Sequence, residues 1–175
     1  ATLLVGIALL ALGGVLLADT SFLRAALKAF PRSKTASCVL FGGASAWFLL
    51  GRIANLSEAD FGQYRNILFV VFAAVAVLSF FYVAEFLAVR GLAALILLAA
   101  GPLLDSAFGE YHIPSRLFMV TAVYVALSAA IWLGAQPWRL RDAIEWVQRV
   151  PGRARITGGA LAAYGLLLAG VAFTY

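Results

Sequence analysis

The longest apolar stretch of the chain, residues 67–89, reads ILFVVFAAVAVLSFFYVAEFLAV and contains a single charged side chain, Glu85. A helix that crosses the hydrocarbon core of a bilayer needs about 20 predominantly apolar residues. A strand of a membrane barrel needs only about 9–11 residues, and its side chains alternate between apolar and polar. This stretch is longer than such a strand and does not alternate, so it predicts a membrane-spanning helix.

Five further apolar blocks accompany this stretch, and together they give the chain the composition of a membrane protein. They cover residues 2–18, 37–53, 92–104, 117–135 and 157–175. Hydrophobic residues make up 64% of the chain and charged residues 12%, whereas soluble domains average about 45–50% and about 25%. We therefore expect an all-α fold, a polytopic transmembrane bundle of about six membrane helices in one integral membrane domain, residues 1–175.

The fourth block is the shortest of the six. The block at 92–104 is long enough to span a bilayer only if it extends from Gly91 to about Phe108. The third and fourth helices would then be joined by a very tight turn at Arg90-Gly91.

Basic and acidic connections alternate along the chain. The connections at 19–34 and 136–156 carry most of the lysines and arginines, whereas those at 54–66 and 105–116 are richer in acidic residues. Basic connections stay in the cytoplasm. The pattern predicts a bacterial inner-membrane protein with both termini on the periplasmic side. The net charge of +5 follows from the same pattern, so we expect no nucleic-acid partner.

Both basic connections have the periodicity of amphipathic helices. In TSFLRAALKAFPR (20–32) and PWRLRDAIEWVQRVPG (137–152), apolar side chains recur at spacings of three and four, opposite a charged face. We predict two short helices in the cytoplasmic interface, bound to membrane lipid. The predicted headgroup contacts are Arg24, Lys28, Trp138, Arg141, Trp146 and Arg149. A docking surface for a cytoplasmic partner is the alternative.

Small residues form a stripe along the last apolar block, at Gly158, Ala162, Gly165 and Ala169. Such a stripe lets a second helix approach closely. It predicts a helix-packing seam, either within this chain or against another membrane subunit or a second copy. Gly42 and Gly43 suggest similar close packing in the second block.

The chain lacks the residue patterns of common catalytic and cofactor sites. It has one histidine and one cysteine, too few for a zinc site or a bis-histidine haem site. It also lacks the G-x-S-x-G, H-E-x-x-H, Gly-Lys-Ser/Thr and C-x-x-C motifs. We therefore expect no catalytic residues, no metal and no cofactor. We expect Cys38 to be a small packing residue.

Charged side chains in or near the membrane are the remaining candidates for a functional site. They are Arg52, Glu85, Asp105, Glu110 and His112. One interpretation is structural: Arg52 snorkels to the headgroups or pairs with Asp105, and Glu85 pairs with Arg90 or the inner basic loops. The other is a solute pathway, or an outer pocket formed by Arg52, Asp105, Glu110 and His112, in which a carboxylate–histidine pair moves a proton.

The segment GPLLDSAFGEYHIPSR, residues 101–116, combines several of these candidates with helix-breaking residues. Gly101-Pro102 is expected to bend or end the fourth helix, and Pro114-Ser115 to open the fifth. The segment is expected to form a structured outer loop, or else the gate of a pore.

Two functional hypotheses follow. The first is a non-catalytic accessory subunit of a larger bacterial membrane complex. The second is a small transporter or channel for a small solute, gated by 101–116; a membrane enzyme is a third. The expected topology resembles that of the small proton-gated urea channels and of the substrate-capturing subunits of some vitamin importers. That resemblance is limited to topology, and no functional residue is carried over from either family.

Overall fold

The computed structural model describes residues 1–110, 112–150 and 152–173, with the backbone alone for Asp60. The eight α-helices are α1 (Thr2–Ala18), α2 (Ser21–Ala29), α3 (Lys34–Phe48), α4 (Arg65–Tyr82), α5 (Leu87–Asp105), α6 (Arg116–Ala135), α7 (Trp138–Arg149) and α8 (Arg153–Val171). No strand occurs in the described part of the chain. The predicted all-α class is confirmed.

Five helical stretches are long and apolar enough to cross a membrane. They are Lys34–Ile53, Gly62–Tyr82, Leu87–Asp105, Arg116–Ala135 and Arg153–Val171. The remaining predicted span, residues 2–18, forms α1. This helix is apolar but has only 17 residues, a length at the short end of the spanning range. The helix predicted for 157–175 instead runs from Arg153 to Val171, and Thr174 and Tyr175 lie outside the described residues.

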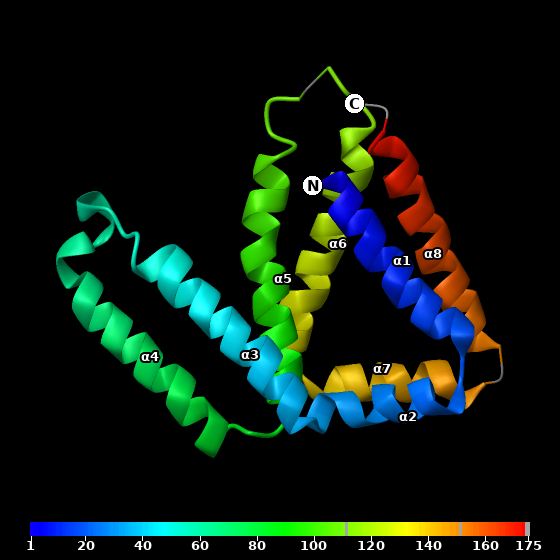
Figure 1. Ribbon diagram of the computed structural model, residues 1–175, viewed down its shortest axis with the longest axis horizontal. Helices are drawn as coiled ribbons and strands as arrows, with labels where there is room; N and C mark the ends of the chain where they lie inside the picture. Colours follow the sequence, from blue (N-terminus) through cyan, green and yellow to red (C-terminus); the bar gives the residue numbers. More distant parts are fainter. Residues whose placement is uncertain (111, 151, 174–175) are drawn as a thin grey trace.

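Helices α1, α3, α5, α6 and α8 rise from one side of a transverse layer formed by α2 and α7, and α4 lies beside α3 (Figure 1). Helices α1 and α8 pack together along their length, α5 and α6 form a central pair, and α3 joins α5 on the other side. Helices α2 and α7 lie across one end of the molecule. The beginning of α1, the end of α8 and the connection between α5 and α6 lie at the opposite end.

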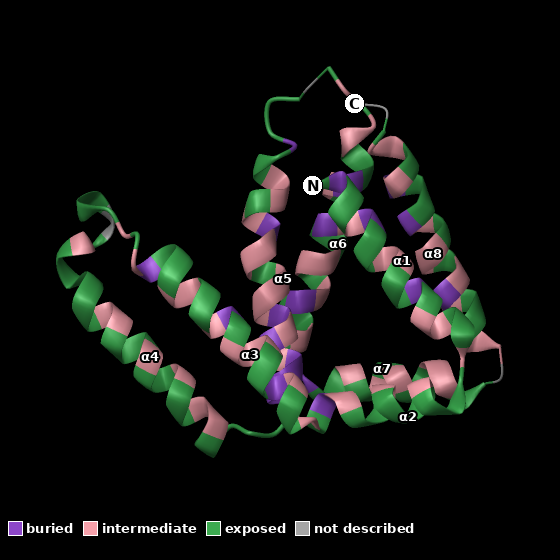
Figure 2. Cartoon of the chain, in the orientation of Figure 1, coloured by how far each residue is buried: buried purple, intermediate pink, exposed green. Residues whose placement is uncertain are grey.

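The buried core lies where α5, α6 and α8 approach one another. It contains Ala100, Ala107, Met119, Val123 and Leu168. Most other side chains are exposed or half-buried (Figure 2). This distribution suits a protein whose helices present apolar side chains to lipid rather than to water.

Local capping explains why α2 stays short and separate from α3. The Thr20 hydroxyl accepts a hydrogen bond from the backbone N–H of Leu23 at 3.3 Å, which caps the start of α2. Pro31 lies in the short turn Phe30–Arg32 that follows the helix. The Ser33 hydroxyl then accepts from the N–H of Ala36 at 3.2 Å and starts α3.

The second amphipathic helix, α7, begins directly after Pro137 and ends before Val150. The two short amphipathic helices predicted from the sequence are therefore present. Pro151, which was expected to mark the end of the second one, lies outside the described residues.

The turn between the third and fourth predicted helices is in a different place from the predicted one. Helix α4 ends at Tyr82 and α5 begins at Leu87, so the connection is residues 83–86 and not Arg90-Gly91. Phe86 makes the turn in the left-handed region with φ 58°. The sequence conceals this turn because VAEF contains no glycine or proline to mark it.

Pro102 does not end α5, which continues to Asp105. The expected end of the helix at Gly101-Pro102 is therefore wrong. The expected bend stays a prediction, because a proline inside a helix removes one backbone hydrogen bond. A hydrogen bond joins the connection after α5 to the start of α6. The Nη1 atom of Arg116 donates to the carbonyl oxygen of Ala107 at 2.8 Å. Helix α6 begins immediately after Pro114-Ser115, as expected.

Candidate functional sites

Arg52 lies in the π-helical turn Leu49–Ile53 that continues α3. Its guanidinium is directed at α5: a Cβ atom on Gly101 would lie 3.1 Å from its Nη2. Asp105 is one helical turn further along α5, yet no ion pair within 4.0 Å joins it to Arg52 in the described part of the chain. The pairing of Arg52 with Asp105 expected from the sequence is thus not formed.

Glu110 and His112 do come together in the connection between α5 and α6. The Nε2 atom of His112 lies 3.6 Å from Oε2 of Glu110, and their side chains are 76% and 51% exposed. Glu110 also lines a hollow of about 360 Å³ with Thr2, Ser106 and Arg116 among others. Arg52, Asp105 and His112 do not line this hollow, so the predicted outer pocket is not assembled from its four members.

Arg116 is a residue of this end that the sequence interpretation did not select. It is half-buried, and it both lines the hollow and holds the connection through Ala107. Its position at the first turn of an apolar block was the only signal in the sequence.

Glu85 lies in the connection between α4 and α5, near the transverse layer and far from the connection between α5 and α6 (Figure 1). The expectation that it sits within the third helix is wrong, because α4 ends three residues earlier. Arg90 donates to the backbone carbonyl oxygen of Glu85 at 3.4 Å; it does not form an ion pair with the Glu85 carboxylate in the described structure. The five candidate pathway residues therefore lie at both ends of the molecule.

The separation of Arg52 from Asp105 has a measurable consequence. In a double-mutant cycle of Arg52→Gln and Asp105→Asn, we expect additive effects on the free energy of unfolding, with a coupling below about 0.5 kcal/mol. Thermal unfolding in detergent measures all four proteins under one condition. A coupling of about 1 kcal/mol or more would contradict this expectation, because it would require an ion pair between the two side chains.

The small-residue stripe on α8 packs against α1 of the same chain. A Cβ atom on Gly165 would lie 2.9 Å from the carbonyl oxygen of Gly6, and one on Gly158 would lie 2.8 Å from that of Gly13. Ala162 and Ala169 also line this contact, each through its backbone nitrogen opposite a glycine of α1. The seam therefore packs within the chain, against α1, which is one of the two alternatives predicted from the sequence.

The glycines singled out in the second apolar block make no such contact. A Cβ atom on Gly42 or Gly43 would meet no atom within 4 Å. The close approach of α3 is instead to Gly91 of α5, where a Cβ atom would lie 2.7 Å from Cα of Phe41.

Helices α2 and α7 lie side by side and are joined by a hydrogen bond between Gln148 and Arg24. The Nε2 atom of Gln148 donates to the carbonyl oxygen of Arg24 at 3.3 Å. The Arg24 guanidinium in turn donates to both carboxylate oxygens of Asp19, at 2.7 Å from Nε and 2.5 Å from Nη2. These hydrogen bonds, with the charges of Arg24 and Arg155, lower the pKa of Asp19 below its usual value despite its desolvation. The pair is therefore charged at neutral pH, and Arg24 is engaged within the chain.

The other side chains predicted to contact lipid headgroups differ in whether they already have a partner within the chain. Arg141 forms an ion pair with Asp142 at 2.9 Å. The Trp146 ring is covered by the guanidinium of Arg153, 4.1 Å from the ring centroid, but both it and Trp138 remain exposed. Lys28 and Arg149 have no carboxylate within 4.0 Å among the described residues.

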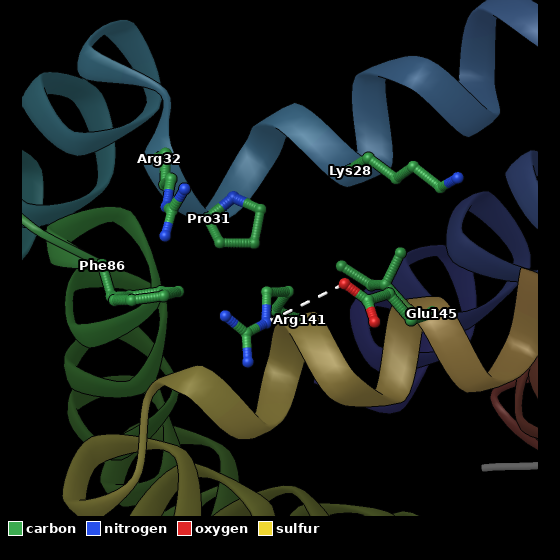
Figure 3. Close-up of a pocket in the computed structure, with 7 residues that line it drawn as sticks. Lys28, Pro31, Arg32, Phe86, Arg141 and Glu145 are labelled. Carbon is green, nitrogen blue, oxygen red and sulfur yellow. Dashed lines mark ion pairs between the residues drawn. The ribbon is translucent and has the colours of Figure 1, made fainter.

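A cavity of about 220 Å³ lies between α2 and α7, at the start of α5 (Figure 3). It is lined by Lys28, Pro31, Arg32, Phe86, Arg141, Ile144 and Glu145. Lys28 lies on α2 and Arg141 on α7, whereas Arg32 lies in the turn Phe30–Arg32 and Phe86 directly precedes α5 (Figure 3). The Arg32 guanidinium lies 5.6 Å from the centroid of the Phe86 ring, within the range of a cation–π contact.

Helix α4 is the least enclosed of the helical stretches long enough to span a membrane in the described part of the chain. None of its residues is buried, and it contacts the rest of the chain through α3 and the turns that join the two helices. Edge-to-face aromatic contacts connect Phe80 to Phe41 and Phe72 to Phe48, with centroids 5.5 and 5.2 Å apart. Its other side chains are exposed or half-buried (Figure 2), and the exposed ones include Ile67, Val70, Val77 and Phe81.

The described residues contain no group of three or more histidine, cysteine, aspartate or glutamate side chains placed to hold a metal ion. The chain's candidate sites are therefore a hollow near Glu110, a cationic cavity beside α2 and an apolar hairpin. No protein-family model, curated protein or solved structure matches the chain.

Proposed function

We propose that this chain is a non-catalytic accessory subunit of a larger bacterial inner-membrane complex, and that the α3–α4 hairpin packs on apolar transmembrane helices of a larger subunit. The observation that carries the proposal is the exposure of α4. It is an 18-residue helix with no buried residue, whereas every other helix of spanning length has buried residues.

The exposed surface of α4 suits a helix partner. Val70 and Val77 are 67% and 58% exposed, and residues seven apart lie two turns apart on one face of a helix. In lipid, helices associate through close van der Waals packing and not through the hydrophobic effect. A face of β-branched side chains with few rotamers loses little conformational entropy when it packs in this way.

The transporter hypothesis has less support. Arg52, Asp105 and His112 do not share a hollow with Glu110, and Glu85 lies near the other end of the molecule. A pathway through the bundle would require polar side chains along its length, and these five do not form such a series.

The orientation belongs to the same proposal: α2 and α7 face the cytoplasm, and both termini face the periplasm. In a Cys38→Ser background, we expect an impermeant maleimide to label Ser106→Cys in spheroplasts and Ala25→Cys only after permeabilisation. Both native residues are exposed. Ser106 directly follows the end of α5 and Ala25 lies in α2, and the end of α5 and α2 lie at opposite ends of the bundle (Figure 1). The reverse labelling would invert the orientation.

The proposed role is tested by the composition of the native assembly. The chain is extracted from its own membrane in a copolymer nanodisc, purified through an affinity tag, and weighed by native mass spectrometry. We expect it to be recovered with a larger membrane protein in constant stoichiometry. Recovery as a lone monomer or homo-oligomer with lipid would refute the proposal, and a homo-oligomer would favour the channel.

Substitutions locate the contact. Val70→Trp together with Val77→Trp should lower co-recovery of the larger subunit at least several-fold, because two bulky rings separate packed helices. Leu4→Trp in α1 is the matched control, since Leu4 is also 68% exposed. An equal loss of co-recovery with Leu4→Trp would mean that α4 is not the docking surface.

A further inference from the structure

The cavity between α2 and α7 has more positive than negative charge. Lys28, Arg32 and Arg141 line it with a single carboxylate, Glu145. Arg141 is compensated, because its guanidinium lies 2.9 Å from Asp142 and 3.9 Å from Glu145. Lys28 and Arg32 have no carboxylate within 4.0 Å in the part of the chain that the structure describes. Two positive charges thus border the cavity without a counter-charge from the protein.

Apolar side chains line the cavity beside these cations (Figure 3). They are those of Pro31, Ile144 and Phe86. The backbone of Phe86 is strained, because its φ of 58° lies in the left-handed region that aromatic residues rarely adopt. Such strain persists where neighbouring contacts over-determine it, and here the ring lies under the Arg32 guanidinium.

A second hollow shares Phe86 with this cavity. Its volume is about 590 Å³, and it lies between the end of α4 and the start of α7. Its aromatic lining residues are Phe81, Tyr82, Phe86 and Trp138, and Glu85 and Arg90 also line it. A cationic cavity and a hollow with four aromatic side chains therefore adjoin at Phe86. This arrangement is complementary to an anionic phospholipid, whose negatively charged phosphate adjoins apolar acyl chains.

We propose that the cavity binds the phosphate of an anionic phospholipid through Lys28 and Arg32, and that the acyl chains leave past Phe86 into the adjoining hollow. The location supports a lipid over a free anion, because the cavity lies within the layer of amphipathic helices that carries the exposed Trp138 and Trp146. The proposal is independent of the accessory role: a lipid could occupy the cavity whether or not α4 has a partner.

The first test compares lipids on the wild-type protein. Purified protein in a non-ionic detergent is titrated with phosphatidylglycerol and, separately, with phosphatidylcholine, and bound lipid is counted by native mass spectrometry. We expect one phosphatidylglycerol to be retained at least roughly tenfold more tightly than phosphatidylcholine. Equal retention of the two lipids would overturn the proposal, and this result requires no variant to fold.

The second test assigns the site. Lys28→Gln with Arg32→Gln should weaken phosphatidylglycerol binding at least roughly tenfold. The reason is that each lysine or arginine near an anionic lipid strengthens its binding, and the double variant removes two of them. Arg149→Gln is the matched control, because Arg149 belongs to the same layer but does not line the cavity, and we expect a change below about twofold. Equal losses for the double variant and for Arg149→Gln would indicate diffuse attraction and overturn the assigned site.

A free phosphate ion is the other source of the same chemistry. Inorganic phosphate at millimolar concentration should leave phosphatidylglycerol bound, because it lacks the acyl chains that the aromatic hollow would hold. Displacement of the lipid by inorganic phosphate alone would show that the cavity is a small-anion site, contrary to the proposal.

Discussion

Replacing Gly165 with leucine should destabilise the protein by about 3 kcal/mol or more, because the side chain would enter the contact between α1 and α8. The obstruction is backbone: a Cβ atom at this position would lie 2.9 Å from the nitrogen of Leu10 and from the carbonyl oxygen of Gly6. Backbone atoms cannot rotate aside as a flexible side chain can, so the two helices must separate. Thermal unfolding in detergent, followed by circular dichroism, measures the loss.

Two controls distinguish a steric effect from a general effect of substitution. Gly170→Leu makes the same change on the same helix where a Cβ atom would meet nothing within 4 Å. We expect its effect to stay within about 0.5 kcal/mol. Leu167→Ala, at a side chain that is 40% exposed, should also be mild. If Gly165→Leu proved as mild as these two, the α1–α8 contact described here would be wrong.

The second large effect is expected at Gly91, where even alanine should be too large. Its Cβ atom would lie 2.7 Å from Cα of Phe41 and 2.8 Å from the carbonyl carbon of Leu40, closer than real Cβ contacts occur. We expect Gly91→Ala to lower the free energy of unfolding by about 2–3 kcal/mol. The loss should concentrate in the α3–α4 hairpin, which joins the rest of the protein mainly through this crossing.

Gly43→Ala on α3 is a control for which we expect a small stabilisation instead of a loss. Gly43 is exposed, and a Cβ atom there would meet nothing within 4 Å. Alanine is the better helix former by about 1 kcal/mol, so the substitution should stabilise the protein slightly. Hydrogen exchange of α3 and α4 should rise in Gly91→Ala and remain unchanged in Gly43→Ala. The same response in both variants would exclude Gly91 as the crossing point.

The contrast between these glycines shows how far sequence reasoning extends for this protein. Gly158, Ala162, Gly165 and Ala169 recur at helical spacing, and such a stripe can be recognised without knowing its partner. A single glycine cannot be interpreted in this way. Gly91 of α5 lies against the backbone of α3, whereas Gly43 faces no other helix within 4 Å, although apolar residues flank both in the sequence.

The charged candidates show the same limit. Nothing in the sequence relates residues on different helices, so an outer pocket of Arg52, Asp105, Glu110 and His112 was a reasonable hypothesis. The structure brings only Glu110 and His112 within ion-pair range. The cationic cavity went unrecognised because Arg32 and Phe86 are 54 positions apart in the numbering and meet only through folding.

The sequence by itself determined the class of this protein, because lengths of apolar sequence and the requirement to satisfy backbone hydrogen bonds in lipid leave only helices. It also determined the two amphipathic helices, whose periodicity and capping residues are local properties. Tertiary structure alone decided the turn at 83–86, the close approaches at Gly91 and Gly165, and the residues that line the cavity. These depend on which helix surfaces meet, and that choice rests on the packing of side chains distant in sequence.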